Sequence, residues 1–169
     1  MPEFLCGYTT FWLHDAARSR PVVVDAWYPA AGPAVEAVRW YGLGTGRAAE
    51  DAHPATGAFP VVLLSHGAFG AARNYSWLAE HLARSGYVVC GVSHFRESYV
   101  HGVETIDPAA AGQVDDRALD CSFALDHLLE ASPLRGTVDG GRVGALGHSS
   151  GGATVMALAG GAFDRAAMG

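Results

Sequence analysis

The chain has 169 residues, of which half are hydrophobic and 17% are charged, and its formal net charge is −6 at pH 7. This length and composition predict one α/β domain with a substantial core, and the acidic balance argues against a nucleic-acid partner. The basic residues other than histidine are all arginine, so a P-loop lysine, a Schiff-base lysine and a Ser–Lys dyad are excluded.

The cysteines Cys6, Cys90 and Cys121 are odd in number and widely spaced. We expect buried free thiols here rather than a disulfide framework or a zinc knuckle. No basic and apolar leader opens the chain, and no apolar run approaches the roughly 18 residues that cross a bilayer. These features predict a cytoplasmic protein without a membrane span, with a lost leader and secretion as the alternative.

Two β-like runs open the chain, Tyr8–His14 and Pro21–Tyr28, and the polar turn between them predicts an antiparallel hairpin. The next segment, Ala30–Ala58, is rich in Ala, Gly and Pro without clear periodicity. It predicts a long loop, of the sort that usually lines a site or is mobile. A dinucleotide site at Gly42-x-Gly44-x-Gly46 is rejected, because this run follows no strand and opens no helix.

Strands and helices alternate from residue 59 onward. The apolar runs Phe59–Ser65 and Tyr87–Ser93 predict buried strands, and a helical pattern from about Asn74 to Ser85 separates them. A polar loop over 94–114 leads to a helix over about Asp115–Ala131. Such alternation is typical of parallel strands joined by right-handed crossovers, which bind ligands at the carboxyl ends of the strands. The apolar positions of the second helix are Leu119, Phe123, Leu125, Leu128 and Leu129.

The most informative stretch is Gly147-His148-Ser149-Ser150-Gly151, which has the pattern G-x-S-x-G. The apolar run Arg142–Leu146 before it predicts a buried strand, and residues 152–159 predict a helix. A serine on a tight strand-to-helix turn presents its hydroxyl at the top of a sheet, where the helix N-terminus directs free N–H groups at an oxyanion. We therefore expect Ser149 to be a nucleophile, with a glycine-rich turn and a capping serine as the alternative.

A second turn follows the strand Phe59–Ser65, with the sequence His66-Gly67-Ala68-Phe69-Gly70. A His-Gly turn in this position is where serine hydrolases of the α/β type build the other half of the oxyanion hole. A backbone N–H must face the developing charge there, so the expected donors are the amides of Ala68 and Ser150. For the ring of His66 we favour a structural role, hydrogen-bonded to loop backbone, over a catalytic one.

Several polar residues fall at the carboxyl ends of the predicted strands. His66, His94 and Ser149 are expected to rim one pocket there. We expect His94 to line the surface or the pocket rather than to bind a metal, and His148 to point away from the nucleophile's line of attack. The remaining charged residues of this loop are expected to be solvated or to contact substrate: Arg96, Glu97 and Asp107.

Together these features resemble the α/β-hydrolases, and more narrowly the platelet-activating-factor acetylhydrolase and dienelactone-hydrolase-like esterases. The resemblance lies in Arg20–Pro29, Val61–Gly70, Asp116–Leu129 and Gly147–Gly152. It implies an α/β-hydrolase-type, mostly parallel sheet with flanking helices behind the N-terminal antiparallel hairpin. It also implies a carboxylic ester hydrolase that forms an acyl-serine intermediate on a short-chain acyl ester or a lactone, without a cofactor or a metal.

The family orders its triad as Ser, Asp, His, but the chain ends 20 residues after Ser149, so the last two have no position to map onto. We therefore expect residues 1–169 to be a single, truncated domain whose C-terminal strands are missing. The edge of the strand 142–147 is then expected to pair with a second chain or to self-associate. The alternative function is a non-catalytic or incomplete fragment that needs a second polypeptide for its Asp and His. A third option is that His94 acts as the base.

Overall fold

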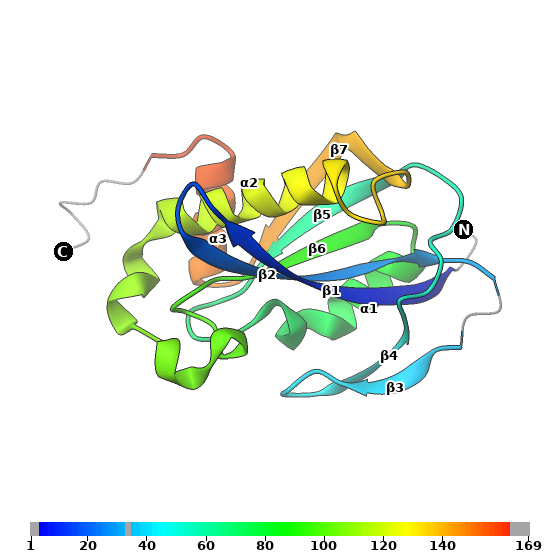
Figure 1. Ribbon diagram of the computed structural model, residues 1–169, viewed down its shortest axis with the longest axis horizontal. Helices are drawn as coiled ribbons and strands as arrows, with labels where there is room; N and C mark the ends of the chain where they lie inside the picture. The colour runs from blue at the N-terminus through cyan, green and yellow to red at the C-terminus, as the bar shows by residue number, and fades with distance from the viewer. Residues whose placement is uncertain (1–3, 33–34, 163–169) are drawn as a thin grey trace.

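The computed structural model of the protein describes residues 4–32 and 35–162. Within them a seven-stranded sheet has the strand order β3-β4-β1-β2-β6-β5-β7 (Figure 1). Strands β1 (Leu5–Asp15) and β2 (Arg20–Ala30) pair antiparallel along their whole length. This confirms the predicted N-terminal hairpin, and β2 joins it to the rest of the sheet by pairing antiparallel with β6.

The prediction of a long loop between Ala30 and Ala58 is wrong. This segment contains two short strands, β3 (Ala37–Trp40) and β4 (Thr45–Glu50), which pair antiparallel with each other. Strand β4 also runs parallel to the start of β1, so the hairpin extends the sheet at one edge. Most of its side chains are exposed, and an exposed edge hairpin lacks the alternating apolar pattern by which strands are recognised in a sequence.

The second half of the sheet is parallel, as predicted. Strand β5 (Phe59–Ser65) lies between β6 (Val88–Ser93) and β7 (Val138–Gly147), and both pairings are parallel. Every residue of β6 is buried, because helices cover both faces of the sheet at this point. The carboxyl ends of these strands meet at one edge, where the turns that follow β5 and β7 lie close together.

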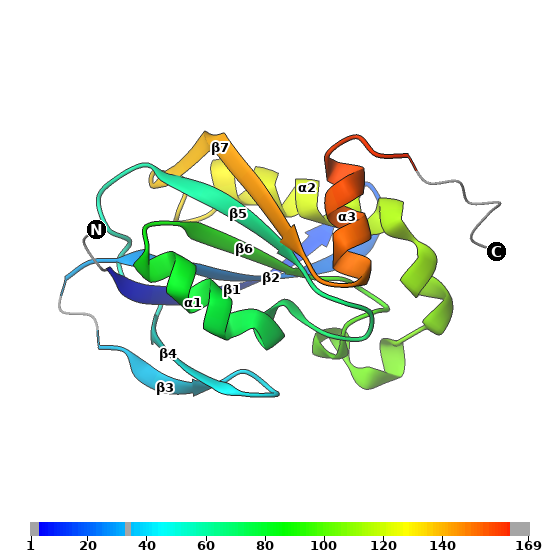
Figure 2. The ribbon, with the colours of Figure 1, turned by 180° about the vertical axis from the view of Figure 1, so that it is seen from behind.

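Helices pack on opposite faces of the sheet. Helix α2 (Val114–Glu130) crosses the face seen in Figure 1, and α1 (Ser76–Arg84) covers the face seen in Figure 2. Helix α3 (Ser150–Leu158) follows β7 and packs beside α2. Four short 3₁₀ helices complete the described chain: η1 (Ala72–Tyr75), η2 (Tyr99–His101), η3 (Val103–Thr105) and η4 (Pro108–Gly112).

Two hydrophobic clusters form the core, one beneath α2 and the other beneath α1. Beneath α2, the buried side chains of Cys121, Ala124 and Leu128 pack on valines and other apolar residues of β2, β5 and β6. Beneath α1, Ala79 and Ala83 pack on the other face of the sheet. Small side chains let α1 approach the sheet closely. The cysteines Cys6, Cys90 and Cys121 are buried and free, as predicted.

Strand β7 includes the predicted strand but begins four residues earlier, at Val138, and it is not buried. Val143 is 41% exposed and Leu146 40% exposed. The reason is its position in the described part of the chain, where β7 is the last strand of the sheet and pairs with β5 alone. None of the helices in this part of the chain is both long and apolar enough to span a lipid bilayer.

Candidate active site

Ser149 occupies a sharp turn between β7, which ends at Gly147, and α3, which begins at Ser150. Its backbone has φ 53° and ψ −119°, a conformation that costs on the order of 1–3 kcal/mol in a residue with a side chain. The residue is exposed. The turn thus has the strained strand-to-helix geometry that the sequence predicts, while the role of Ser149 as a nucleophile stays a prediction.

Two glycines make this turn possible, because other backbone segments pass too close for a side chain. A Cβ atom on Gly147 would lie 2.0 Å from the carbonyl oxygen of Gly151. A Cβ atom on Gly151 would lie 2.0 Å from the carbonyl oxygen of Ser65. The second contact places the start of α3 directly against the end of β5. The serine turn and the His-Gly turn are therefore neighbours.

An open cavity of about 510 Å³ lies between these two turns. Ser149 and Ala68, which the sequence analysis assigns to one site, both line it. The full lining is Leu43, Gly67, Ala68, Phe69, Gly70, Asn74, Tyr75, Tyr99, His148 and Ser149. Leu43 comes from the turn between β3 and β4, a segment in which the sequence had indicated no regular structure.

The wall beside the serine carries a hydrogen-bonded Tyr–His pair. The Tyr75 hydroxyl lies 2.9 Å from Nδ1 of His148, and the Gly67 N–H donates to the same hydroxyl at 3.4 Å. The hydroxyl accepts from this amide, and the tautomer of His148 decides which partner donates in the Tyr75–His148 hydrogen bond. His148 lines the cavity together with Ser149, and its ring is hydrogen-bonded to Tyr75.

His66 and His94 do not rim this cavity, contrary to expectation, because both are fully buried beneath the His-Gly turn. The N–H of His94 donates to Nε2 of His66 at 3.1 Å, so the proton of this imidazole is on Nδ1, which donates to the Gly67 carbonyl at 2.6 Å. Burial, together with the neighbouring His94, holds the pKa of His66 well below its ordinary value. A neutral ring bound to loop backbone is the structural role predicted for His66.

His94 belongs to a buried Ser–His–Asp arrangement. Its Nε2 lies 3.0 Å from the Ser65 hydroxyl and its Nδ1 lies 3.0 Å from a carboxylate oxygen of Asp120. Burial lowers the pKa of His94 to about 4, although Asp120 opposes the shift. These three residues have the atoms of a catalytic triad, but they are at most 1% exposed, and a substrate has no access to them. We find no support for His94 as the base of Ser149, because Nε2 of His94 is hydrogen-bonded to the Ser65 hydroxyl.

Arginines hold the carboxylate of this arrangement. Arg20 donates to both oxygens of Asp120, at 2.8 Å and 3.0 Å, and Arg18 donates to one of them at 2.8 Å. Burial opposes the charged form of Asp120, but the hydrogen bonds from His94 and Arg20 outweigh it and keep the pKa of the carboxyl below its ordinary value. Asp120 is therefore an ionised, fully paired side chain inside the protein.

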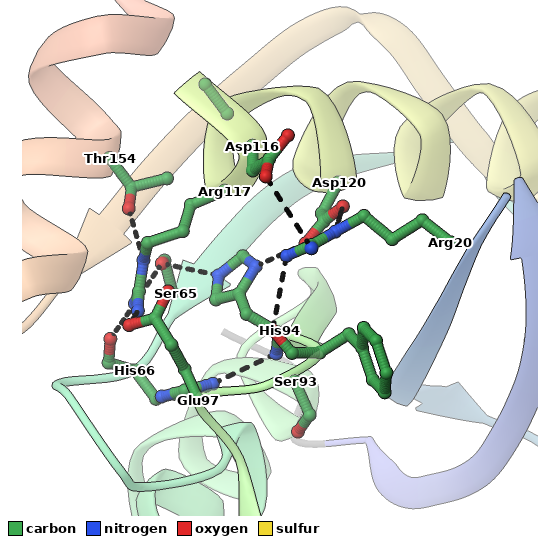
Figure 3. A network of polar contacts seen from close by, with 12 residues as sticks. Arg20, Ser65, His66, Ser93, His94, Glu97, Asp116, Arg117, Asp120 and Thr154 are labelled. Carbon is green, nitrogen blue, oxygen red and sulfur yellow. Dashed lines mark hydrogen bonds and ion pairs between the residues drawn. The ribbon is translucent and has the colours of Figure 1, made fainter. Parts of the chain in front are cut away.

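Glu97 was expected to be solvated or to touch substrate, and this is wrong. It is buried and forms an ion pair of 2.6 Å with Arg117, which is also buried (Figure 3). No role had been predicted for Arg117 or Asp120. Their spacing in the sequence could have indicated that they are buried. Residues three or four apart on a helix lie on one face, and on α2 this face carries the buried Cys121.

The described residues, 4–32 and 35–162, contain no group of three or more His, Cys, Asp or Glu side chains that could hold a metal ion.

The chain matches one protein-family model and is similar to curated proteins named as a hydrolase and cutinases. Residues 52–168 match the model of the chlorophyllase family. The chain is 30% identical over 133 residues to bis(hydroxyethyl) terephthalate hydrolase of Streptomyces coelicolor, covering 78% of this chain and 38% of that protein. It is also 30% identical over 103 residues to cutinase 1 of Thermobifida cellulosilytica, covering 60% of this chain and 34% of that protein. The chain therefore spans well under half the length of these curated relatives.

Solved structures agree with this. A ferulic acid esterase from Streptomyces cinnamoneus superposes with a TM-score of 0.79 at 27% identity, covering 92% of this chain and 55% of that one. A dienelactone hydrolase-like promiscuous phosphotriesterase from metagenomic libraries superposes with a TM-score of 0.57 at 18% identity, covering 90% and 54% of the two chains. The second likeness concerns the fold alone. Together they confirm the α/β-hydrolase fold predicted from the sequence.

Proposed function

The chain belongs to the chlorophyllase family, and from this premise we propose that it is a serine hydrolase of carboxylic esters. Ser149 attacks the acyl carbonyl and forms an acyl-serine intermediate, which water then hydrolyses. The observation that carries the proposal is the exposed Ser149 on its strained turn beside the cavity. Relatives named as hydrolase, cutinase and esterase support it.

We assign the oxyanion hole to the backbone amides of Ala68 and Ser150. Two observations support this assignment. Ala68 lines the cavity beside Ser149, and Ser150 is the first residue of α3, where the helix dipole favours negative charge. The loss of one donor from such a hole lowers kcat by about 10²–10³-fold in serine hydrolases, so both amides contribute substantially to the reaction.

Ser149 also needs a general base, because a serine hydroxyl alone is a weak nucleophile at neutral pH. Among the described residues, the histidine that joins a serine to a carboxylate is His94, and that serine is Ser65. We propose that the base and acid for Ser149 come from a polypeptide segment outside residues 4–162, bound beside β7. An apolar groove of about 360 Å³ next to β7, lined by Val143 and Val155 among others, supports this location.

The lining of the cavity supports an aromatic ester as substrate. Phe69, Tyr75 and Tyr99 line it, and aromatic rings interact favourably with one another in offset or edge-to-face geometry. Two relatives are named for aromatic compounds, terephthalate and ferulic acid. We therefore propose an ester with an aromatic acyl group, in preference to the short acyl chain or lactone that the resemblance had implied.

Labelling with a fluorophosphonate probe tests the proposed nucleophile. In the complete gene product we expect the probe on Ser149 and none on a Ser149→Ala variant. Ser122→Ala is the matched control, because Ser122 is an exposed serine on α2 and its loss leaves labelling unchanged. A wild-type protein that takes up no probe, or a Ser149→Ala variant that labels as well as wild type, would refute the proposal.

A further inference from the structure

Arg117 lies in the first turn of α2 and is fully buried. Its guanidinium donates to four acceptors in three other segments (Figure 3). One is the Glu97 carboxylate, which balances its charge. The other three belong to the segments on either side of the cavity: the Ser65 hydroxyl at 3.2 Å, the His66 carbonyl, and the Thr154 hydroxyl at 2.9 Å.

The contact with His66 holds the turn that carries Ala68. Arg117 fixes the His66 carbonyl in the interior, and the next carbonyl, that of Gly67, accepts from Nδ1 of His66 at 2.6 Å and from the Gly70 N–H at 3.1 Å. A peptide unit is planar, with C=O and N–H on opposite sides. A Gly67 carbonyl held inward therefore turns the Ala68 N–H outward, to the side of the cavity that Ala68 lines.

The contact with Thr154 reaches the second half of the proposed oxyanion hole. The Thr154 hydroxyl accepts from Nε of Arg117 and donates to the Ser150 carbonyl at 3.2 Å. Thr154 lies one helical turn after Ser150, so this hydroxyl connects Arg117 to the residue whose amide we assign as the other donor. One rigid guanidinium thus joins the two turns that meet at the cavity.

We propose that Arg117 is a positioning residue that sets the spacing of the Ala68 and Ser150 amides. The inference rests on the proposed function, since it assigns Arg117 to that same oxyanion hole. Arginine suits this task because its planar fork offers several donors in fixed directions, whereas a lysine ammonium is a single point on a flexible stem. A buried ion pair with Glu97 would by itself require only one of these contacts.

The sharpest test separates the link to Ser150 from the ion pair. Thr154→Val removes the hydroxyl but leaves the Arg117–Glu97 pair intact, and Thr154→Ser keeps the hydroxyl. Thr137→Val makes the same chemical change at a hydroxyl that bonds only the Leu134 carbonyl, in the turn before β7. Arg117→Lys keeps the positive charge but not the fork. The protein used is the complete gene product, with p-nitrophenyl benzoate as substrate.

We expect Thr154→Val to lower kcat about tenfold and Arg117→Lys about a hundredfold, with KM changed less than about twofold, because an oxyanion contact acts in the transition state. Thr154→Ser and Thr137→Val should match wild type. The kcat is counted per site titrated to completion with fluorophosphonate, so a fraction of unfolded protein does not lower it. Amide hydrogen exchange of residues 66–70 and 148–152 should accelerate together in Thr154→Val.

The failures are distinguishable. A wild-type protein that neither labels nor hydrolyses the ester refutes the proposed function, and this inference with it. An active wild type whose Thr154→Val and Arg117→Lys variants keep its kcat per titrated site refutes the role of Arg117 alone. Equal losses in Thr154→Val and Thr154→Ser also refute it, since the hydroxyl would then be irrelevant.

Discussion

Two serines stand at the ends of adjacent parallel strands, and their surroundings give them opposite properties. Ser65 is 1% exposed, donates to His94 and accepts from Arg117, so its hydroxyl is fully used inside the protein. Ser149 is exposed on a turn of positive φ and lines the cavity. A reaction requires access to the substrate. The buried Ser–His–Asp arrangement of Ser65, His94 and Asp120 is therefore structural, and the exposed Ser149 is the candidate nucleophile.

Replacement of these serines should separate the two roles. We expect Ser149→Ala to remove ester hydrolysis and leave the melting temperature within about 2 °C of wild type, since it deletes one exposed hydroxyl and creates no core cavity. Ser65→Ala should still label at Ser149, but it should lose about 1–3 kcal/mol of unfolding free energy, because it removes the hydroxyl that bonds Nε2 of the buried His94 and one acceptor of the buried Arg117. Labelling and urea unfolding of both variants check this. The reverse pattern would exchange the roles of the two serines.

The buried histidines predict a loss of stability in acid. The pKa of His94 is lowered from 6.5 to about 4 in the folded protein by burial. Between these values the unfolded chain binds a proton that the folded chain does not, so the free energy of unfolding falls as the pH falls from about 6.5 to 4. The contribution of His94 is about 3 kcal/mol over this window, and the lowered pKa of His66 acts in the same direction.

Urea unfolding at pH 7.5, 6 and 5 measures this dependence. We expect a His94→Gln variant to show a flatter pH profile than wild type, and a variant of the exposed His81, His81→Gln, to keep the wild-type slope. Equal stability of the wild type at pH 7.5 and pH 5 would contradict the assignment of a neutral, buried His94.

At the scale of elements, the sequence predicts what is encoded locally. Strong apolar runs predict β5 and β6, and the G-x-S-x-G pattern predicts the turn at Ser149, because both depend on neighbours in the chain. The β3–β4 hairpin is missed, since its exposed strands have little apolar pattern. In α2, Leu119 is 49% exposed while Arg117 and Asp120 are fully buried. From the sequence alone, charged residues on a helix indicate a solvent-exposed face. The burial of Arg117 and Asp120 depends on their contacts with distant segments, which the local sequence does not encode.

The β3–β4 hairpin carries a prediction about substrate binding. Leu43 at its turn is 76% exposed and lines the cavity with Ser149. If an aromatic ester packs on this side chain, Leu43→Ser should raise KM for p-nitrophenyl benzoate about fivefold, equivalent to about 1 kcal/mol of lost apolar contact, and leave kcat unchanged. Kinetics on both p-nitrophenyl benzoate and p-nitrophenyl acetate measure this, and the smaller acetate should show a weaker effect.

Val38→Ser is the matched control for the hairpin. Val38 is 67% exposed on β3 but does not line the cavity, so its loss should leave KM for both esters unchanged. An equal rise of KM in both variants would indicate that the hairpin acts through its folding and not through contact with the substrate.

At the scale of the whole molecule, the sheet has two unlike edges within the described residues. One is the short β3, and the other is β7, with its exposed Val143 and Leu146 and the apolar groove beside it. Unpaired backbone groups along an apolar edge are a template for pairing with another strand. The same edge lies next to Ser149, so a segment that covers β7 is also in a position to supply the base that we propose for Ser149.

This arrangement predicts that residues 1–169, expressed alone, associate with one another and hydrolyse esters slowly. Association should bury the edge of β7. Because we propose that the base comes from outside residues 4–162, the chain alone should keep only the rate that oxyanion binding provides, about 10³–10⁴-fold above water. Analytical ultracentrifugation measures the first property and p-nitrophenyl benzoate hydrolysis the second. A Val143→Lys variant should associate less, because an edge lysine opposes pairing between strands.

Val103→Lys controls for the added charge, because Val103 is 71% exposed on η3, away from the sheet edge. It should associate as strongly as the wild type. If the chain proves to be a monomer that hydrolyses the ester at 1–10³ s⁻¹, roughly the range of ordinary enzymes, then β7 needs no covering segment. The base would then have to be a histidine already near Ser149, and His148, which shares the cavity with it, would be the residue to replace next.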